Sequence, residues 1–183
     1  IMNNFIKEDD KQTILIVSDT GTKRHRVKPN LVEKVEEILS LAKKFSMLNF
    51  YIIGGGNEEE YLRSLATENV FFLGKINQKK MSLELDKIDL HILPSRSEGF
   101  PKVILETASA GIPSLVYSDY GASEWINHGE NGFIVDNFNQ MCNLLNLLLE
   151  DDMLLNFNSK GAYNMSRIFD WKIVVKEWEK HIL

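Results

Sequence analysis

The chain has 183 residues, of which 21 are Lys or Arg and 26 are Asp or Glu, and its formal net charge is −5. This acidic balance argues against general nucleic-acid binding, and the single cysteine, Cys142, has no partner for an internal disulfide, as is usual in a reducing compartment. No apolar run reaches the length of a membrane span, and the polar start IMNNFIKEDDK lacks the features of a signal peptide.

Short apolar runs alternate with segments of helical periodicity along the chain. The runs expected to form buried strands are residues 13–18, 49–53, 69–73, 88–93, 113–117 and 132–135. The segments expected to form helices are residues 29–45, 58–66, 78–86, 101–110, a short one near 123–127, and the remainder from Phe138. This alternation predicts an α/β fold with a Rossmann-like parallel sheet of about six strands, helices on both faces and additional C-terminal helices. We expect one domain over residues 1–183.

The most informative segment is PSRSEGFPKVILETASAGIP, residues 94–113, directly after the fourth expected strand. It places Glu98 on a loop and Glu106 on the following helix, and Pro101 suits the first turn of that helix because its missing N–H costs nothing there. Ligands of parallel sheets bind beyond the carboxyl ends of the strands, where a helix N-terminus attracts an anion. Two carboxylates beside such a site suit a ligand that carries both hydroxyls and phosphate, such as a nucleotide sugar.

A basic loop and a glycine run supply further candidates. The loop KRHRVK, residues 23–28, precedes the first expected helix, and its Lys28, Arg24 and Arg26 are candidates for phosphate binding. By itself such a loop is more often simply solvated, and contact with an anionic membrane is a further alternative. The run that begins at Gly54 lacks the G-x-G-x-x-G form and is interpreted as a close-approach turn lining a cleft. No His, Cys and carboxylate cluster has metal-ligand spacing, so no metal or cofactor is expected.

The order of motifs resembles the nucleotide-sugar-binding half of family 4 retaining glycosyltransferases, which have the GT-B architecture. Their P-S-x-x-E-G-F-[GP]-x-V-x-x-E-A motif is matched from Pro94 to Glu106 and departs at Thr107. YGASEWI resembles G-G-x-x-E-V-[IV] with Tyr120 in place of the first glycine, and HGENGFIV resembles D-G-x-N-G-x-L-V. IIGGG, NVFFLGKI and FDWKIVVKEW resemble three further motifs in the same order, so the resemblance covers residues 14–178.

The resemblance also implies roles for individual residues. It implies that Glu98 and Lys28 serve catalysis, with Glu98 beside the transferred sugar, and that Glu106 accepts hydrogen bonds from the ribose hydroxyls. It implies donor binding by residues at the start of the fourth helix, in the basic loop and at the ends of two strands: Gly99, Phe100, Pro101, Lys102, Val103, Ile104, Arg24, Arg26, Gly54, Gly74, Lys75 and Ile76. The chain departs from the family at Ser18 and Asp19, which stand where Gly and Arg are usual.

We therefore expect a cytoplasmic glycosyltransferase that moves a sugar from a nucleotide-diphosphate sugar to an acceptor with retention, in bacterial surface polysaccharide or glycoconjugate synthesis. The acceptor is expected to be a saccharide or a lipid-linked molecule, and peripheral membrane association is left open. GT-B enzymes bind the acceptor through an N-terminal domain, which we expect to be absent here, so the isolated chain should be inactive or weakly active. The alternatives are a non-catalytic nucleotide-sugar-binding module, favoured by the departure at Ser18 and Asp19, and an epimerase-like GT-B relative.

Overall fold

The computed structural model describes residues 13–17 and 30–182. Its strands are β1 (Thr13–Val17), β2 (Asn49–Ile53), β3 (Val70–Gly74), β4 (Leu90–Leu93), β5 (Ser114–Tyr117) and β6 (Gly132–Val135). Its α-helices are α1 (Asn30–Lys44), α2 (Glu59–Leu65), α3 (Gln78–Leu85), α4 (Lys102–Ser109), α5 (Phe138–Glu150), α6 (Asp152–Ile168) and α7 (Trp171–Ile182). The expected strands are all present.

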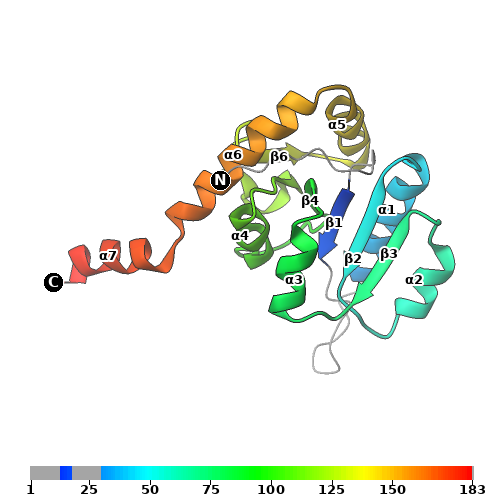
Figure 1. The fold of residues 1–183 in the computed structure, drawn as a ribbon, viewed down its shortest axis with the longest axis horizontal. Coiled ribbons are helices and arrows are strands. Elements are labelled where there is room, and N and C mark those ends of the chain that lie inside the picture. The colour runs from blue at the N-terminus through cyan, green and yellow to red at the C-terminus, as the bar shows by residue number, and fades with distance from the viewer. Residues whose placement is uncertain (1–12, 18–29, 183) are drawn as a thin grey trace.

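The six strands form one parallel sheet in the order β3-β2-β1-β4-β5-β6 (Figure 1). This is the strand order of the Rossmann fold, in which the chain first adds strands on one side of β1 and then crosses to the other side. The order reverses between β1 and β4, which pair through Ile14 with Leu90 and Leu15 with His91. In folds of this kind, ligands bind outside the carboxyl ends of the strands at such a reversal.

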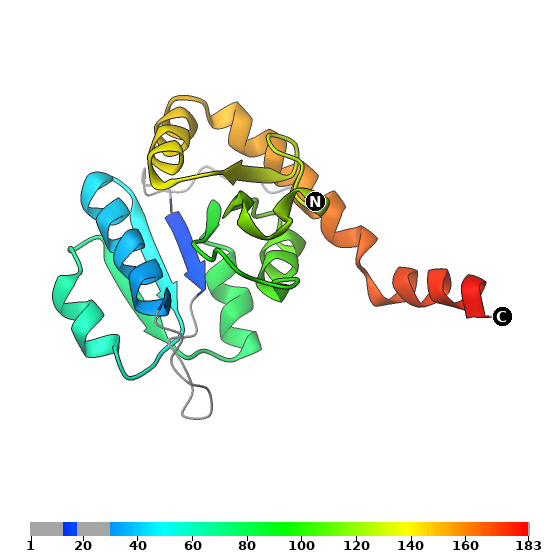
Figure 2. The ribbon, with the colours of Figure 1, turned by 180° about the vertical axis from the view of Figure 1, so that it is seen from behind.

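Alternate residues of each strand face opposite layers of helices, as the period of two in a strand requires. On one face the core joins strand residues such as Phe50, Ile92 and Leu115 to buried residues of α1, α2 and α5. On the other face, Val116 packs with α4 and α6, and Ile53 packs with α3. The helices thus cover both faces, as the two opposite views show (Figures 1 and 2).

The short helix expected near residues 123–127 is a 3-10 turn instead, η2 (Ala122–Glu124), which follows a second such turn, η1 (Ser118–Tyr120). Gly121 lies between them with a φ of 71°, in the left-handed region that glycine adopts without steric cost. Gly121 therefore separates the two turns, and η2 ends before Trp125, whose φ of −138° lies outside the helical range.

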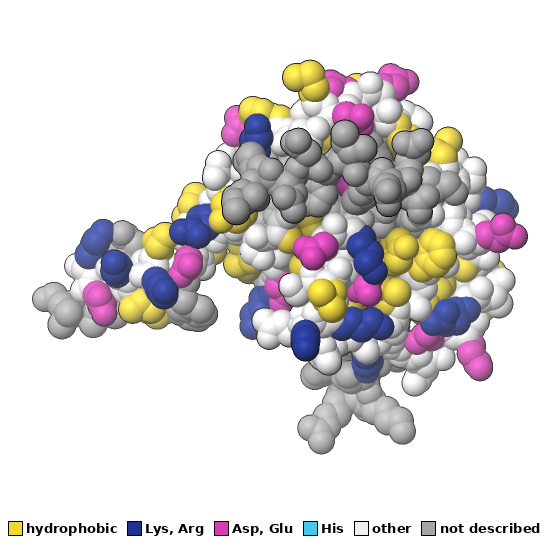
Figure 3. All heavy atoms as spheres, viewed as in Figure 1, with side chains coloured by type: hydrophobic (Ala, Val, Ile, Leu, Met, Phe, Trp, Pro, Cys, Tyr) yellow, Lys and Arg dark blue, Asp and Glu magenta, His cyan; other side chains and the backbone are white. Residues whose placement is uncertain are grey.

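The C-terminal helices leave the sheet in sequence. The α6 helix packs along α4, whereas α7 projects away from the body of the domain (Figure 1). Apolar, basic and acidic side chains are all exposed along this arm (Figure 3). The exposed apolar residues include Ile173, Val175 and Trp178. Among the residues that the structure describes, no helix combines the length and the apolar character needed to cross a membrane.

Substitution of Gly161 by alanine should destabilise the fold. A Cβ on this α6 residue would clash with the carbonyl oxygen of Glu130 and lie 2.8 Å from its carbonyl carbon. Alanine favours a helix by up to about 1 kcal/mol over glycine, but overpacking against backbone typically costs about 1–3 kcal/mol, so we expect a net loss of stability in urea unfolding. Lys160→Ala, at an exposed position of the same helix, serves as the control. A Gly161→Ala variant as stable as the original protein would contradict this packing.

The folding stability should fall below neutral pH because of His91. This β4 residue is fully buried, its Nδ1 lies 2.9 Å from Ser114 Oγ, and burial lowers its pKa to about 3. The unfolded chain takes up the proton near pH 6.5, so stability is fully present above that pH and is lost as the pH falls from there toward 3. At pH 5 the loss relative to pH 7 is about 2 kcal/mol.

Urea unfolding at pH 7 and pH 5 checks this expectation. His91→Gln keeps a polar group beside Ser114 but cannot titrate, so this variant should show a smaller difference between the two pH values. An equal difference in both proteins would exclude His91 as its source.

Candidate active site

Glu98 lies on the loop between β4 and α4, at the carboxyl edge of the sheet. Ser95 of the same loop is 2% exposed, and its hydroxyl donates a hydrogen bond to Glu98 Oε1. Lys34 on α1 reaches this loop, and its Nζ lies 2.8 Å from Ser95 Oγ. The loop that carries Glu98 is thereby connected to a helix that is distant in sequence, a link that we did not predict from the sequence.

Arg96 anchors the same loop at a second point. Its guanidinium lies 3.9 Å from the centre of the Tyr117 ring, and its Nη1 is 2.8 Å from Asp119 Oδ2. The Tyr117 hydroxyl donates to the carboxylate of Glu37 on α1. Burial, together with this hydrogen bond, raises the pKa of Tyr117 above its ordinary value, so the phenol stays protonated and remains a donor.

The helix α4 begins one residue later than expected. Pro101 is its N-cap rather than part of its first turn, and the Ile104 N–H donates to the Pro101 carbonyl at 3.0 Å. Of the three N–H groups expected to face an anion, Ile104 therefore already has a partner. The N–H groups of Lys102 and Val103 have no partner within the helix, because its first turn leaves them unpaired.

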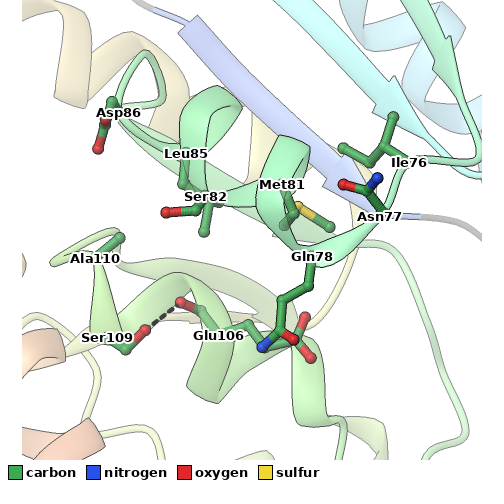
Figure 4. Close-up of a pocket in the computed structure, with 10 residues that line it drawn as sticks. All are labelled: Ile76, Asn77, Gln78, Met81, Ser82, Leu85, Asp86, Glu106, Ser109 and Ala110. Carbon is green, nitrogen blue, oxygen red and sulfur yellow. Dashed lines mark hydrogen bonds between the residues drawn. The ribbon is translucent and has the colours of Figure 1, made fainter.

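Glu106 lines a cavity of about 780 Å³ between α3 and α4. In Figure 4 the Gln78 side chain extends from α3 toward Glu106, while Ser109 donates its hydroxyl to the Glu106 carbonyl at 2.7 Å. The cavity is lined by residues of both helices and of the turn before α3: Ile76, Asn77, Gln78, Met81, Ser82, Leu85, Asp86, Glu106, Ser109 and Ala110. Glu98 is not part of this lining, so the two carboxylates occupy different surroundings.

The expected glycine segments lie together at the ends of β2 and β3. The Gly54 N–H donates to the Gly74 carbonyl at 3.0 Å, and both glycines have positive φ, 133° and 67°. The Lys75 side chain lies over Gly55, and Ile76 then enters the cavity wall. Of these candidates, Ile76 is therefore the one that shares the cavity with Glu106. Asn77 and Gln78 follow it directly, and the helix-capping pattern at Asn77 is the signal that could have found them.

An aromatic cluster borders the Glu98 loop. Phe100 is 41% exposed and packs against Trp125 and Phe169, with ring centres 5.6 and 5.4 Å away. The buried hydroxyl of Tyr120 has no hydrogen-bond partner within residues 13–17 and 30–182. Burial, followed by the negative charges of Glu98 and Asp119, raises the pKa of Tyr120. Gly99 is exposed, and a Cβ added there would have no atom within 4 Å apart from those of its chain neighbours.

The remaining candidates concern the basic loop. Lys28, Arg24 and Arg26 lie outside the described residues, so their expected contacts with phosphate stay predictions. In the part of the chain that is described, no group of three His, Cys, Asp or Glu side chains could hold a metal ion. The described site thus offers carboxylates, an amide side chain and helix N–H groups, which together suit a ligand with hydroxyls and phosphate.

Comparison with known proteins adds evidence from outside the chain. Residues 4–165 match the family described as glycosyl transferases group 1. An uncharacterized glycosyltransferase of Haemophilus influenzae is 31% identical over 147 residues, which cover 76% of this chain and 41% of that protein. The O-antigen biosynthesis glycosyltransferase WbnH of Escherichia coli is 31% identical over 164 residues, which cover 88% of this chain and 40% of that protein.

A solved structure supports the fold. The Anabaena protein Alr3699/HepE, crystallised in complex with UDP-glucose, superposes with a TM-score of 0.68 at 20% identity, over 86% of this chain and 44% of that one. At this level of identity the likeness concerns the fold alone. This chain therefore spans about two fifths of the length of the relatives described above.

Proposed function

The chain belongs to the glycosyl transferases group 1 family, and from this premise we propose that it is the donor-binding, C-terminal domain of a family 4 retaining glycosyltransferase. The observation that carries the proposal is the position of Glu106, which lines a cavity of about 780 Å³ beside Ile76 and Gln78. A cavity of this size can hold a nucleoside and adjoining phosphates.

The nucleoside occupies the cavity between α3 and α4. An ionised carboxylate accepts hydrogen bonds only, so Glu106 suits the two neighbouring hydroxyls of a ribose. Gln78 and Asn77 offer amide groups at the α3 side, where the edge of a base needs both donors and acceptors. Ile76 and Met81 supply apolar contact for the flat face of the base.

The diphosphate lies at the N-terminus of α4. The N–H groups of Lys102 and Val103, together with the helix dipole, favour negative charge at this position. When the bond between the anomeric carbon and the phosphate breaks, negative charge grows on the leaving phosphate, and donors fixed in advance lower the barrier. We assign Lys28 and one of Arg24 and Arg26 to the same phosphate, as the family resemblance implies.

The transferred sugar lies beside Glu98. The carboxylate binds sugar hydroxyls or stabilises the positive charge that develops at the anomeric carbon. The acceptor hydroxyl forms the new bond on the face that the phosphate leaves, and its proton passes to that phosphate, so the configuration is retained. No metal takes part in this scheme.

The biological setting is proposed from the relatives. WbnH acts in O-antigen biosynthesis according to its name, and we propose a role in bacterial surface polysaccharide or glycoconjugate synthesis on the cytoplasmic side. A saccharide or lipid-linked acceptor would be held by a second domain of the GT-B architecture. Peripheral contact with the inner face of the membrane fits a lipid-linked acceptor.

Glu106→Ala should weaken nucleotide binding by about tenfold or more, because hydrogen bonds to a charged acceptor contribute about 1.5–3 kcal/mol. Isothermal titration calorimetry of the 183-residue chain with UDP, GDP and ADP measures this. Glu68→Ala is the matched control. Glu68 lies before β3, at the amino ends of the strands, whereas the candidate site lies at their carboxyl ends. Equal affinity of the Glu106→Ala variant and the original chain for every nucleotide would refute the donor-site assignment.

Glu98→Ala should reduce transfer with little change in nucleotide affinity, because Glu98 stands apart from the cavity. The measurement is kcat in a protein that contains both GT-B domains, with UDP, GDP and ADP sugars as donors. An unchanged kcat would exclude the catalytic role of Glu98, whereas no turnover of any donor by the original two-domain protein would favour a non-catalytic binding module.

A further inference from the structure

Glu98 stands on an exposed loop, yet its carboxylate is held by a chain of hydrogen bonds that begins on another element. Lys34 Nζ lies 2.8 Å from Ser95 Oγ, and Ser95 Oγ donates to Glu98 Oε1. We propose that Lys34 is a positioning residue for Glu98 and that it acts through Ser95. The inference rests on the proposed function, because it specifies how the sugar side of the donor site is kept in place.

The direction of this chain follows from the chemistry of its three groups. A lysine ammonium has donors only, so Ser95 Oγ must accept from Lys34. The single hydroxyl hydrogen of Ser95 then has to point to an acceptor. The Glu98 carboxylate accepts only, and the competing acceptor, the Ser97 carbonyl, is at 3.4 Å, near the limit for a hydrogen bond. The hydrogen therefore points to Glu98.

The first two members of the chain are fixed by burial. Ser95 is 2% exposed, so water has little access to its hydroxyl and cannot easily replace either partner. Lys34 is half-buried on a helix of 15 residues whose Val35 and Ile38 are fully buried in the core. Lys34 thus projects from a rigid element, and its stem is partly packed, whereas Glu98 without this contact would be an exposed side chain with several accessible rotamers.

The same face of α1 holds the loop at its next residue as well. Glu37, a helical neighbour of Lys34, accepts the Tyr117 hydroxyl, and Arg96 lies over the Tyr117 ring. Ser95 and Arg96 are therefore both fixed from α1, one by a direct hydrogen bond and one through Tyr117. The second contact keeps the loop backbone in place, so removal of Lys34 should alter the orientation of Glu98 and leave the fold of the loop intact.

A Glu98 carboxylate held in place affects recognition of the sugar and not of the nucleotide. A carboxylate fixed before binding does not lose further rotamer freedom when it contacts a sugar hydroxyl, and correct placement of such groups is a large part of catalytic efficiency. Glu106 and the start of α4 do not take part in the Lys34–Ser95–Glu98 chain. Loss of Lys34 should therefore weaken the recognition of a sugar nucleotide while the free nucleoside diphosphate binds as before.

Calorimetry of the 183-residue chain tests the proposal with UDP, GDP and ADP and with UDP-glucose, GDP-mannose and ADP-glucose. For the pair that binds most tightly, Lys34→Met should weaken the sugar nucleotide about tenfold and leave the nucleoside diphosphate within about twofold. Lys34→Arg should restore most of the loss, because a guanidinium can also donate to Ser95. Lys43→Met, at an exposed position of α1, is the control and should change neither affinity.

A double-mutant cycle separates action through Ser95 from a direct contact of Lys34 with the ligand. Ser95→Ala should reproduce the effect of Lys34→Met, and the double variant should be no weaker than Ser95→Ala alone. The positioning role would be overturned if the loss of sugar-nucleotide affinity in the double variant equalled the product of the two single losses. An equal loss of affinity for the nucleoside diphosphate and the sugar nucleotide would also overturn it. Unchanged sugar-nucleotide affinity in Lys34→Met would overturn it too. If the original chain binds none of the six compounds, the proposed function itself fails, and this inference fails with it.

Discussion

The pairing of β1 with β4 is the constraint on which the site depends. Because the strand order reverses there, α1 and α4 pack on opposite faces of the sheet while the segments beyond both strands meet at its carboxyl edge. Lys34 on α1 can therefore reach Ser95 on the loop before α4, although 61 residues separate them. The loop with Glu98 thus owes its contact with α1 to the position of β4 beside β1.

The two carboxylates of the motif have different neighbours although they are close in sequence. Glu106 lines an open cavity formed with α3, where hydroxyls and a base can approach it. Glu98 is linked through Ser95 to α1 and lies on the side of the loop that faces Phe100 and Tyr120. Under the proposed function, this separation lets the nucleoside and the sugar of a donor contact different carboxylates. The hydroxyl of Tyr120, which has no hydrogen-bond partner among the described residues, adds polarity beside Glu98, where the resembling family motif has glycine.

The local hydrophobic pattern predicted the strands and helices well. The prediction failed where backbone conformation or contacts between distant residues intervened. The strands β2 and β6 begin and end where the apolar runs indicated, because a strand buried on both faces must be continuously apolar. The expected helix near residue 123 is only a 3-10 turn, because the backbone leaves the helical range at Trp125, where φ is −138°. Pro101 became an N-cap, and the Ile104 N–H, expected to be available, bonds to its carbonyl.

The sequence by itself determined the α/β class, the order of elements and the placement of Glu98 and Glu106, because hydrophobic periodicity and motif spacing are local properties. Only the tertiary structure decided which side chains surround those carboxylates. Gln78 and Glu106 line one cavity, and Lys34 reaches Ser95, because the sheet brings segments that are distant in the chain together at the carboxyl ends of its strands. The spacing of residues along the chain does not predict such contacts, since they depend on how whole layers pack around the sheet.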